Sequence, residues 1–100
     1  MLLAVDIGNT GITLGIFDGD TLGPRWRLAS DSERTVDEYG ILLSQLMERA
    51  GKASGRVDSI AIASVVPPLT GIFERACREY LGASGSCMAT GRTPLSYLHP

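Results

Sequence analysis

The stretch that decides the fold is MLLAVDIGNTGITLGIFDG, residues 1–19. Residues 2–5 are continuously apolar, which is typical of a strand buried on both faces. Residues 12–17 also resemble a strand, because apolar Ile12, Leu14 and Ile16 alternate with Thr13 and Gly15. Between them a lone carboxylate, Asp6, leads into Gly-Asn-Thr-Gly, which is turn chemistry. The stretch therefore predicts two antiparallel strands joined by a tight turn, with Asp6 where the first strand ends.

The next segment predicts a third antiparallel strand. Asp-Gly-Asp at residues 18–20 is a hairpin signal, because Asp-Gly tolerates the positive φ of such turns. Residues 21–29 follow, with Trp26 and Leu28 on one face. Pro24 indicates that this strand lies at an edge of the sheet or carries a bulge. The opening of the chain is thus a three-stranded meander.

The pattern then changes to a helical period. Thr35 and Glu38 match a capping box, and apolar residues recur at helical spacing over residues 36–50 before Gly51, a helix stop. The small and β-branched residues 57–66 predict an interior strand.

A second helix follows the two prolines at residues 67–68, which suit a first helical turn. An apolar stripe runs along it to residue 81, and Gly82 stands where a C-cap belongs. Residues 86–89 predict a short further strand. The order βββαβαβ and the right-handed crossover rule put the fourth strand beside the first. The sequence therefore predicts an α/β fold with a mixed sheet of order 3-2-1-4-5.

Composition excludes several classes of protein. The net charge of −2 and the scattered arginines give no basic face, which argues against binding nucleic acid or an anionic membrane. No apolar stretch approaches the roughly 20 residues of a membrane span, and Asp6 interrupts the apolar N-terminus, so no signal peptide is expected. Cys77 and Cys87 lie in no metal-ligand spacing and His99 is the only histidine, which favours reduced thiols over structural zinc. We expect a cytoplasmic protein.

Asp6 marks the candidate site, because open α/β sheets bind ligands at the carboxyl ends of central strands. Gly8 has no Cβ, so its amide has room to approach a phosphate, and Asn9 and Thr10 add side-chain donors. Consecutive amides in such a turn make an anion-binding nest, beside which Asp6 would hold Mg²⁺ directly or through water. The other interpretation is an ordinary hairpin turn that Asp6 caps. The motif alone leaves both interpretations open.

Other residues that attract attention favour structural interpretations. Trp26 fits a core residue between two outward-facing arginines, Arg25 and Arg27, better than a stacking platform. Tyr39 is expected in the core, with a substrate-side role as the alternative. Ser64 is expected to hydrogen-bond the backbone rather than a ligand.

Three linked motifs extend over nearly the whole chain: DIGNT, WRLASDSERTVDEYGILLSQL and IASVVPPLTGIFERACREYLG. In this order and spacing they resemble the N-terminal region of type III pantothenate kinases, members of the actin-like ATPase and sugar kinase superfamily. The resemblance implies an RNase H-like fold, in which residues 1–100 form the N-terminal phosphate-binding lobe of a two-lobed kinase. It favours the phosphate-binding turn over the plain hairpin.

The resemblance also implies an activity, the transfer of the γ-phosphoryl group of ATP to the primary hydroxyl of pantothenate, which begins coenzyme A synthesis. Mg²⁺ and a monovalent cation, K⁺ or NH₄⁺, would assist, with Asp6 on the metal side, and the full-length protein would be a homodimer. Tyr97 matches, across a gap, a family tyrosine that lines the pantothenate pocket. The ATP-phosphate loop would consist of Asp6, Ile7, Gly8, Asn9, Thr10, Gly11, Ile12 and Thr13.

The resemblance places no catalytic residue within the chain, because the family's proposed general base is an aspartate in a G-A/G-D-R motif that would follow Pro100. The second lobe, with the adenosine-binding and cation-binding residues, would follow it too, so residues 1–100 alone are expected to be inactive. Gly11 stands where the family more often has a polar residue such as Asn, which predicts a looser nest. The alternatives are a non-catalytic nucleotide-binding or transcription-accessory module and an inactive remnant.

Overall fold

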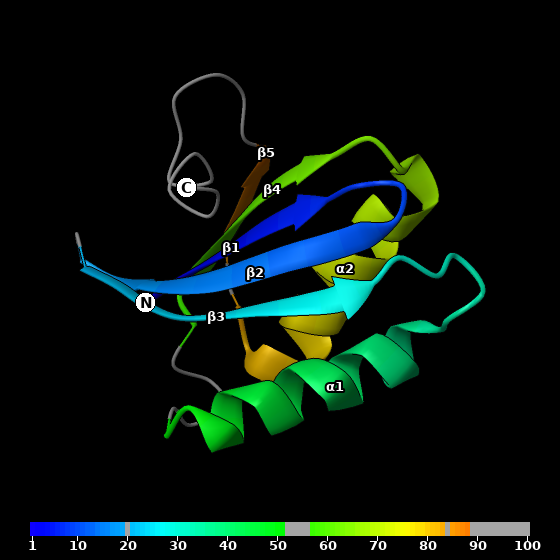
Figure 1. Ribbon diagram of the computed structural model, residues 1–100. Helices are drawn as coiled ribbons and strands as arrows, with labels where there is room; N and C mark the ends of the chain where they lie inside the picture. The colour runs from blue at the N-terminus through cyan, green and yellow to red at the C-terminus, as the bar shows by residue number, and fades with distance from the viewer. Residues whose placement is uncertain (20, 52–56, 84, 89–100) are drawn as a thin grey trace.

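Five strands and two helices make up the part of the chain that the computed structural model describes, residues 1–19, 21–51, 57–83 and 85–88 (Figure 1). In chain order they are β1 (Leu2–Ile7), β2 (Gly11–Asp18), β3 (Thr21–Ala29), α1 (Val36–Arg49), β4 (Ser59–Ser64), α2 (Pro67–Leu81) and β5 (Gly85–Met88). The strands form one sheet of order β3-β2-β1-β4-β5. Neighbours among β1, β2 and β3 are antiparallel, whereas β1, β4 and β5 run parallel. The predicted mixed sheet and its strand order are confirmed.

β1 is longer than the apolar run that predicted it. It continues through Asp6 to Ile7, and both residues stay in register with β2 on one side and β4 on the other. Hydrogen bonding to two neighbouring strands outweighs the low strand propensity of an aspartate. β4 is shorter than predicted and ends at Ser64, because Val66 is already the N-cap of α2. Asp6 therefore lies near the carboxyl end of the central strand, as predicted, with Ile7 as the last residue of that strand.

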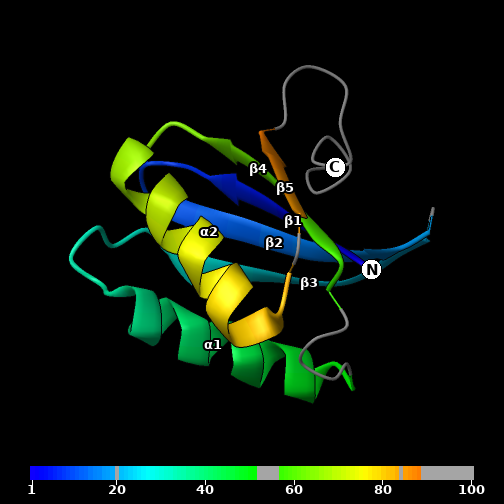
Figure 2. The same cartoon turned by 180° about the vertical axis from the view of Figure 1, so that it is seen from behind.

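The two helices pack on the same face of the sheet and against each other, as the view from behind shows (Figure 2). Because side chains of a strand alternate between faces, the helix-covered face receives every second residue. On β1 and β2 these are Leu3, Val5, Ile7, Ile12, Leu14 and Ile16, all buried in the main core. The opposite face carries a smaller apolar cluster of Ala4, Phe17, Leu2, Leu22 and Ala63, to which no described helix contributes.

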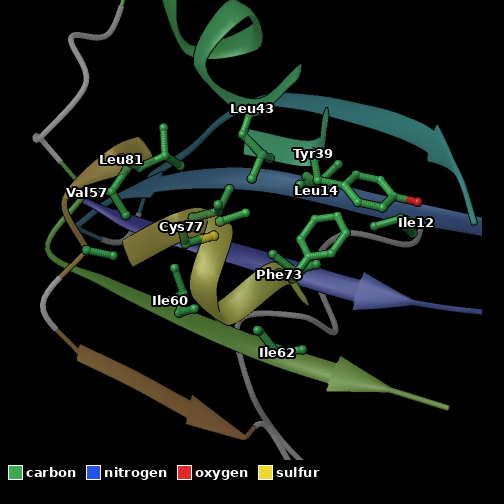
Figure 3. Close-up of a cluster of buried hydrophobic side chains, with 14 of the residues drawn as sticks. Ile12, Leu14, Tyr39, Leu43, Val57, Ile60, Ile62, Phe73, Cys77 and Leu81 are labelled. Atoms are coloured by element: carbon green, nitrogen blue, oxygen red, sulfur yellow. The ribbon is translucent and has the colours of Figure 1, made fainter. Parts of the chain in front are cut away.

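Tyr39 of α1 and Phe73 of α2 meet within the main core (Figure 3). Their ring centroids are 4.7 Å apart and the rings are inclined at 46°, a favourable aromatic arrangement. The Tyr39 hydroxyl accepts a hydrogen bond from the Asp31 N–H at 3.0 Å, and the Ala29 and Asp31 carbonyls lie 3.2 Å away as acceptors for its proton. Tyr39 is fully buried and its hydroxyl is satisfied, which confirms its predicted place in the core.

The helix ends agree with the sequence signals. The Glu38 N–H donates to the Thr35 hydroxyl at 3.1 Å and the Thr35 N–H donates to the Glu38 carboxylate at 3.0 Å, which completes the capping box of α1. α2 begins with two prolines and ends at Gly82, whose φ of 72° lies in the left-handed region that side chains oppose. Of the helices in the described ranges, neither combines the length and apolarity needed to cross a bilayer.

β3 is an edge strand and also carries a bulge. Phe17 of β2 pairs with Leu22, but Gly15 pairs with Arg25, so the two residues 23–24 of β3 stand opposite a single residue of β2. Pro24 predicted that this strand lies at an edge of the sheet or carries a bulge, and both features are confirmed.

Candidate functional site

Asp6 lies near the carboxyl end of β1, the central strand of the sheet. Its chain neighbours Val5 and Ile7 are buried in the main core, so alternation puts Asp6 on the face that α1 and α2 leave uncovered. There it is half-buried, in register with Thr13 of β2 and Ala63 of β4. The parallel strands β1 and β4 both end at this edge, which is where open α/β sheets bind ligands.

The turn after β1 is closed through its two glycines. The Gly8 N–H donates to the Gly11 carbonyl at 2.9 Å, and the Gly8 carbonyl accepts a hydrogen bond from the Ser30 hydroxyl, just after β3. The Gly8 amide is thus engaged in the turn, which differs from the expectation that it faces a ligand. Asn9 and Thr10, both exposed at the tip, are the residues left to donate to an anion.

Space, rather than backbone angle, explains why positions 8 and 11 are glycines, since neither has a positive φ. A Cβ on Gly8 would lie 3.2 Å from the Gly11 carbonyl oxygen, which is tighter than ordinary contact. A Cβ on Gly11 would lie 2.5, 2.7 and 2.9 Å from the Nη2, Cζ and Nε atoms of Arg27. The Arg27 guanidinium therefore fills the space over Gly11 that a side chain would occupy.

Arg27 is a residue of this site that sequence reasoning missed, because it was expected only to face outward beside a core tryptophan. β3 pairs it with Thr13, which in turn pairs with Asp6. A row of side chains, Ala63, Asp6, Thr13 and Arg27, thus crosses the face of the sheet opposite the two helices. Trp26 packs against the main core from the other face, as predicted. Strand alternation was the signal that could have placed Arg27 on the same face as Asp6.

The bulge in β3 decides which side chains share this row. If the hairpin register of Asp18 with Thr21 continued uninterrupted, Thr13 would oppose Trp26 instead of Arg27. The additional residue shifts the pairing by one, and a shift of one residue exchanges the two faces of a strand. The bulge therefore turns Trp26 toward the core and brings Arg27 beside Thr13.

The other residues of the predicted site have different surroundings. Ile7 and Ile12 bury their side chains in the main core, so only their backbone can face a ligand. Thr13 is half-buried in the row described above. Tyr97, the predicted pantothenate-pocket residue, lies outside the described residues.

Ser64 stands where β4 ends and the chain turns into α2. Its hydroxyl accepts from the Val66 N–H at 3.0 Å and donates to the Val66 carbonyl at 3.1 Å, so its predicted bonding to backbone is confirmed. The next residue, Val65, donates its N–H to the Ile7 carbonyl at 3.1 Å. The Val65–Ile7 bond holds the ends of β1 and β4 together at the edge of the sheet that carries Asp6, and the Ser64 bonds close the turn that follows β4.

Asp6 is an acidic side chain whose place at this edge suits a metal. In the ranges that the structure describes, no three or more His, Cys, Asp and Glu side chains gather as a metal centre. A lone carboxylate still suits Mg²⁺, because this ion keeps several waters and is held by one or two carboxylates together with substrate phosphates. The half-buried Asp6 beside an exposed turn fits that mode of binding.

Two solved structures define the class of fold. A ROK hexokinase from Thermus thermophilus matches with a TM-score of 0.60 at 17% identity, over 88% of this chain and 34% of its own. RuvC from Thermus thermophilus matches with a TM-score of 0.54 at 14% identity, over 87% of this chain and 63% of its own. At such identities the likeness concerns the fold alone, which is RNase H-like, as in the actin-like ATPases.

Sequence comparison narrows this class to one family. The model of the type III pantothenate kinase family matches residues 2–96. The type III pantothenate kinase of Geobacter sulfurreducens is 45% identical over 104 residues, which cover all of this chain and 40% of that protein. The chain belongs to the type III pantothenate kinase family. It spans about two fifths of the length of the curated relatives it matches.

Proposed function

We propose that the chain is the phosphate-binding lobe of an ATP-dependent kinase that converts pantothenate to 4'-phosphopantothenate, the first step of coenzyme A synthesis. The observation that carries this proposal is the family match over residues 2–96. A carboxylate and a glycine-bounded turn at the carboxyl edge of the central strands support it. Phosphoryl transfer depends mainly on positioning and charge stabilisation, and residues at such an edge supply both.

The residues of this lobe would position the triphosphate. Asn9 and Thr10, exposed at the tip of the turn, would donate hydrogen bonds to phosphate oxygens from their side chains and amides. Asp6 would hold Mg²⁺, directly or through water, and the bound metal would offset the charge of the phosphates. Thr13, beside Asp6 in the row, would add a hydroxyl at the same place.

The rest of the machinery is assigned to the part of the protein that would follow Pro100. It would supply the aspartate that acts as general base, the adenosine contacts and the site for a monovalent cation, K⁺ or NH₄⁺. Tyr97 would line the pantothenate pocket. We further propose that the complete protein is a cytoplasmic homodimer whose substrate is a small molecule rather than nucleic acid or membrane.

The test joins this chain to the C-terminal portion of the Geobacter sulfurreducens relative, in place of the segment that the chain matches. The joined protein is expected to release ADP only when both ATP and pantothenate are present, and residues 1–100 alone are expected to release none. Asp6→Asn should lower kcat/KM of the joined protein by about 100-fold or more, because it removes the metal-side charge while keeping the size of the side chain.

Asp18→Asn is the matched control, since it removes a carboxylate at the exposed far end of β2. It is expected to leave kcat/KM near the wild-type value. Normal turnover by Asp6→Asn would refute the metal-side role of Asp6. A joined protein that is folded by circular dichroism but shows no pantothenate-dependent ADP release would refute the proposed substrate. Turnover by residues 1–100 alone would place the general base within this chain.

A further inference from the structure

The proposed phosphate loop has no positive charge of its own. Residues 6–13, DIGNTGIT, include one carboxylate and neither lysine nor arginine. A nucleoside triphosphate with one bound Mg²⁺ remains an anion at neutral pH, and Asp6 adds to the negative charge around it. A cation in contact with the phosphates would offset this repulsion and add charge-assisted hydrogen bonds.

Among the residues that the structure describes, Arg27 is a cation that the fold brings to this turn. Its Nη2, Cζ and Nε atoms lie 2.5–2.9 Å from the point that a Cβ of Gly11 would occupy, and the Gly11 carbonyl closes the turn by accepting the Gly8 N–H. The guanidinium therefore rests on the loop itself. Its side chain is exposed, and across the described ranges no acidic side chain forms an ion pair with it.

We propose that Arg27 is a phosphate-binding residue, whose guanidinium, seated over Gly11, contacts a phosphate of the bound nucleotide and supplies the positive charge that residues 6–13 lack. This inference rests on the proposed function, because it assumes that ATP is the ligand bound at this turn. Arginine suits the role because its planar fork donates two parallel hydrogen bonds to a phosphate. Gly11 is the other half of the arrangement, because a side chain there would displace the guanidinium.

Arg25 provides a matched control on the same strand and the same face. Both arginines are exposed, but Arg25 pairs with Gly15 and so lies one row further from the turn, roughly 7 Å along the strand. The same change of charge at the two positions therefore differs in its distance from the proposed phosphate site.

Arg27→Gln and Arg25→Gln are compared in the joined protein described above, with Arg27→Lys as the conservative variant. Arg27→Gln should lower kcat/KM for ATP by about 10- to 100-fold, the range of one charged hydrogen-bonded contact. The KM for pantothenate and the thermal midpoint should stay near wild type, and Arg27→Lys should recover part of the loss. Arg25→Gln should stay within about twofold of wild type, as an exposed charge remote from the ligand does. Equal losses in the two glutamine variants, or a loss confined to pantothenate, would overturn the inference.

A titration of the 100-residue chain with inorganic triphosphate and with Mg·ATP separates this inference from the proposed function. If triphosphate binds, and Arg27→Gln weakens it at least about tenfold while Arg25→Gln does not, Arg27 binds phosphate whether or not the joined protein acts on pantothenate. If the 100-residue chain binds neither ligand, the comparison of Arg27→Gln with Arg25→Gln in the joined protein decides whether Arg27 contacts the nucleotide. Absence of both binding and ATP turnover would overturn the inference together with the proposed function.

The contact between Gly11 and Arg27 allows a second test. The effect of Gly11→Ala on kcat/KM for ATP should depend on Arg27 only if the arginine binds the nucleotide. Gly11→Ala pushes against the far end of a flexible side chain, so we expect it to fold and to lose ATP kcat/KM by displacing the guanidinium. In the Arg27→Gln background the same substitution should cost less than about twofold, because the group that it displaces is gone. Fully additive losses would show that Gly11 affects the nucleotide independently and would overturn the coupling.

Discussion

Cys77 lies on the inner side of α2, buried among core side chains (Figure 3). Burial raises the pKa of its thiol to about 12, and the nearby Glu74 carboxylate adds to the rise. A thiol with this pKa stays protonated at physiological pH, so it is neither a nucleophile nor a ready metal ligand. The sequence-based expectation of a reduced, structural thiol at this position fits its surroundings.

The raised pKa predicts how stability depends on pH. In the unfolded chain the Cys77 thiol ionises near its ordinary value of 9.0, whereas in the native protein it keeps its proton up to about 12. The unfolded state therefore binds fewer protons between these values, and the free energy of unfolding should fall as pH rises through this window. Urea denaturation of two proteins measures this dependence on pH. One carries Cys87→Ser alone and the other carries Cys87→Ser together with Cys77→Ala. The alanine variant should lose less stability between pH 8 and pH 11, and an equal loss in both proteins would contradict the prediction.

At the scale of elements, α1 and α2 are in contact at Gly40, a residue of α1 without a side chain. A Cβ on Gly40 of α1 would overlap the ring of Tyr80 in α2, so this ring packs directly on the α1 backbone. The Tyr80 hydroxyl donates to the Asp37 carboxylate, about one turn earlier on α1. This bond is the main reason why the pKa of Tyr80 is raised, because the ionised hydroxyl would lose it. Tyr80 thus joins the two helices through both its ring and its hydroxyl.

Gly40→Ala should therefore destabilise the protein, against the usual gain of about 1 kcal/mol for replacing glycine within a helix. Forcing a methyl group into a filled contact costs about 1–3 kcal/mol, so we expect a net fall in the free energy of unfolding. Gly71→Ala is the matched control, because Gly71 is an exposed residue of α2 and a Cβ there would have nothing within 4 Å. It should raise stability by about 0.5–1 kcal/mol in the same urea titrations. Stabilisation by both substitutions would show that the Tyr80 ring can move aside.

At the scale of the whole molecule, the chain's path could be predicted because independent local signals agree. The capping box at Thr35 and Glu38 and the glycine at Gly82 mark helix ends by hydrogen-bonding chemistry that acts within a few residues. The strand order then follows from the chirality of the crossover. Asp6 could be placed on the correct edge by the same reasoning, because it needs only the order of the strands.

The composition of the site could be predicted less well, because it depends on register between strands. Pro24 indicated a bulge or an edge, but only the pairing itself shows that the bulge exchanges Trp26 and Arg27 between faces. Gly8 had two possible explanations, close approach of a ligand or an ordinary hairpin turn. Its N–H bond to the Gly11 carbonyl depends on the three-dimensional path of the turn, which the residue types did not specify.

The pairing of the central strand has a consequence for how the protein is made. Leu2 at the start of β1 lies beside Ser59 of β4, so β1 gains its second neighbour only after most of the chain exists. Before that, β1 is an open edge whose unpaired amides and carbonyls, among apolar side chains, form a template for association. Joining distant segments in parallel is slow, because the loop entropy is lost before the contacts form.

A fragment of residues 1–51, which has the meander and α1 but lacks β4, should therefore self-associate, whereas residues 1–88 should do so much less. Light scattering of the two fragments at equal concentration measures the difference, and a monomeric, folded 1–51 fragment would contradict it. On the ribosome, the meander and α1 would emerge before β4, the strand that pairs with the second edge of β1. Until β4 has been translated, the newly made chain should therefore need a chaperone that covers the open edge of β1.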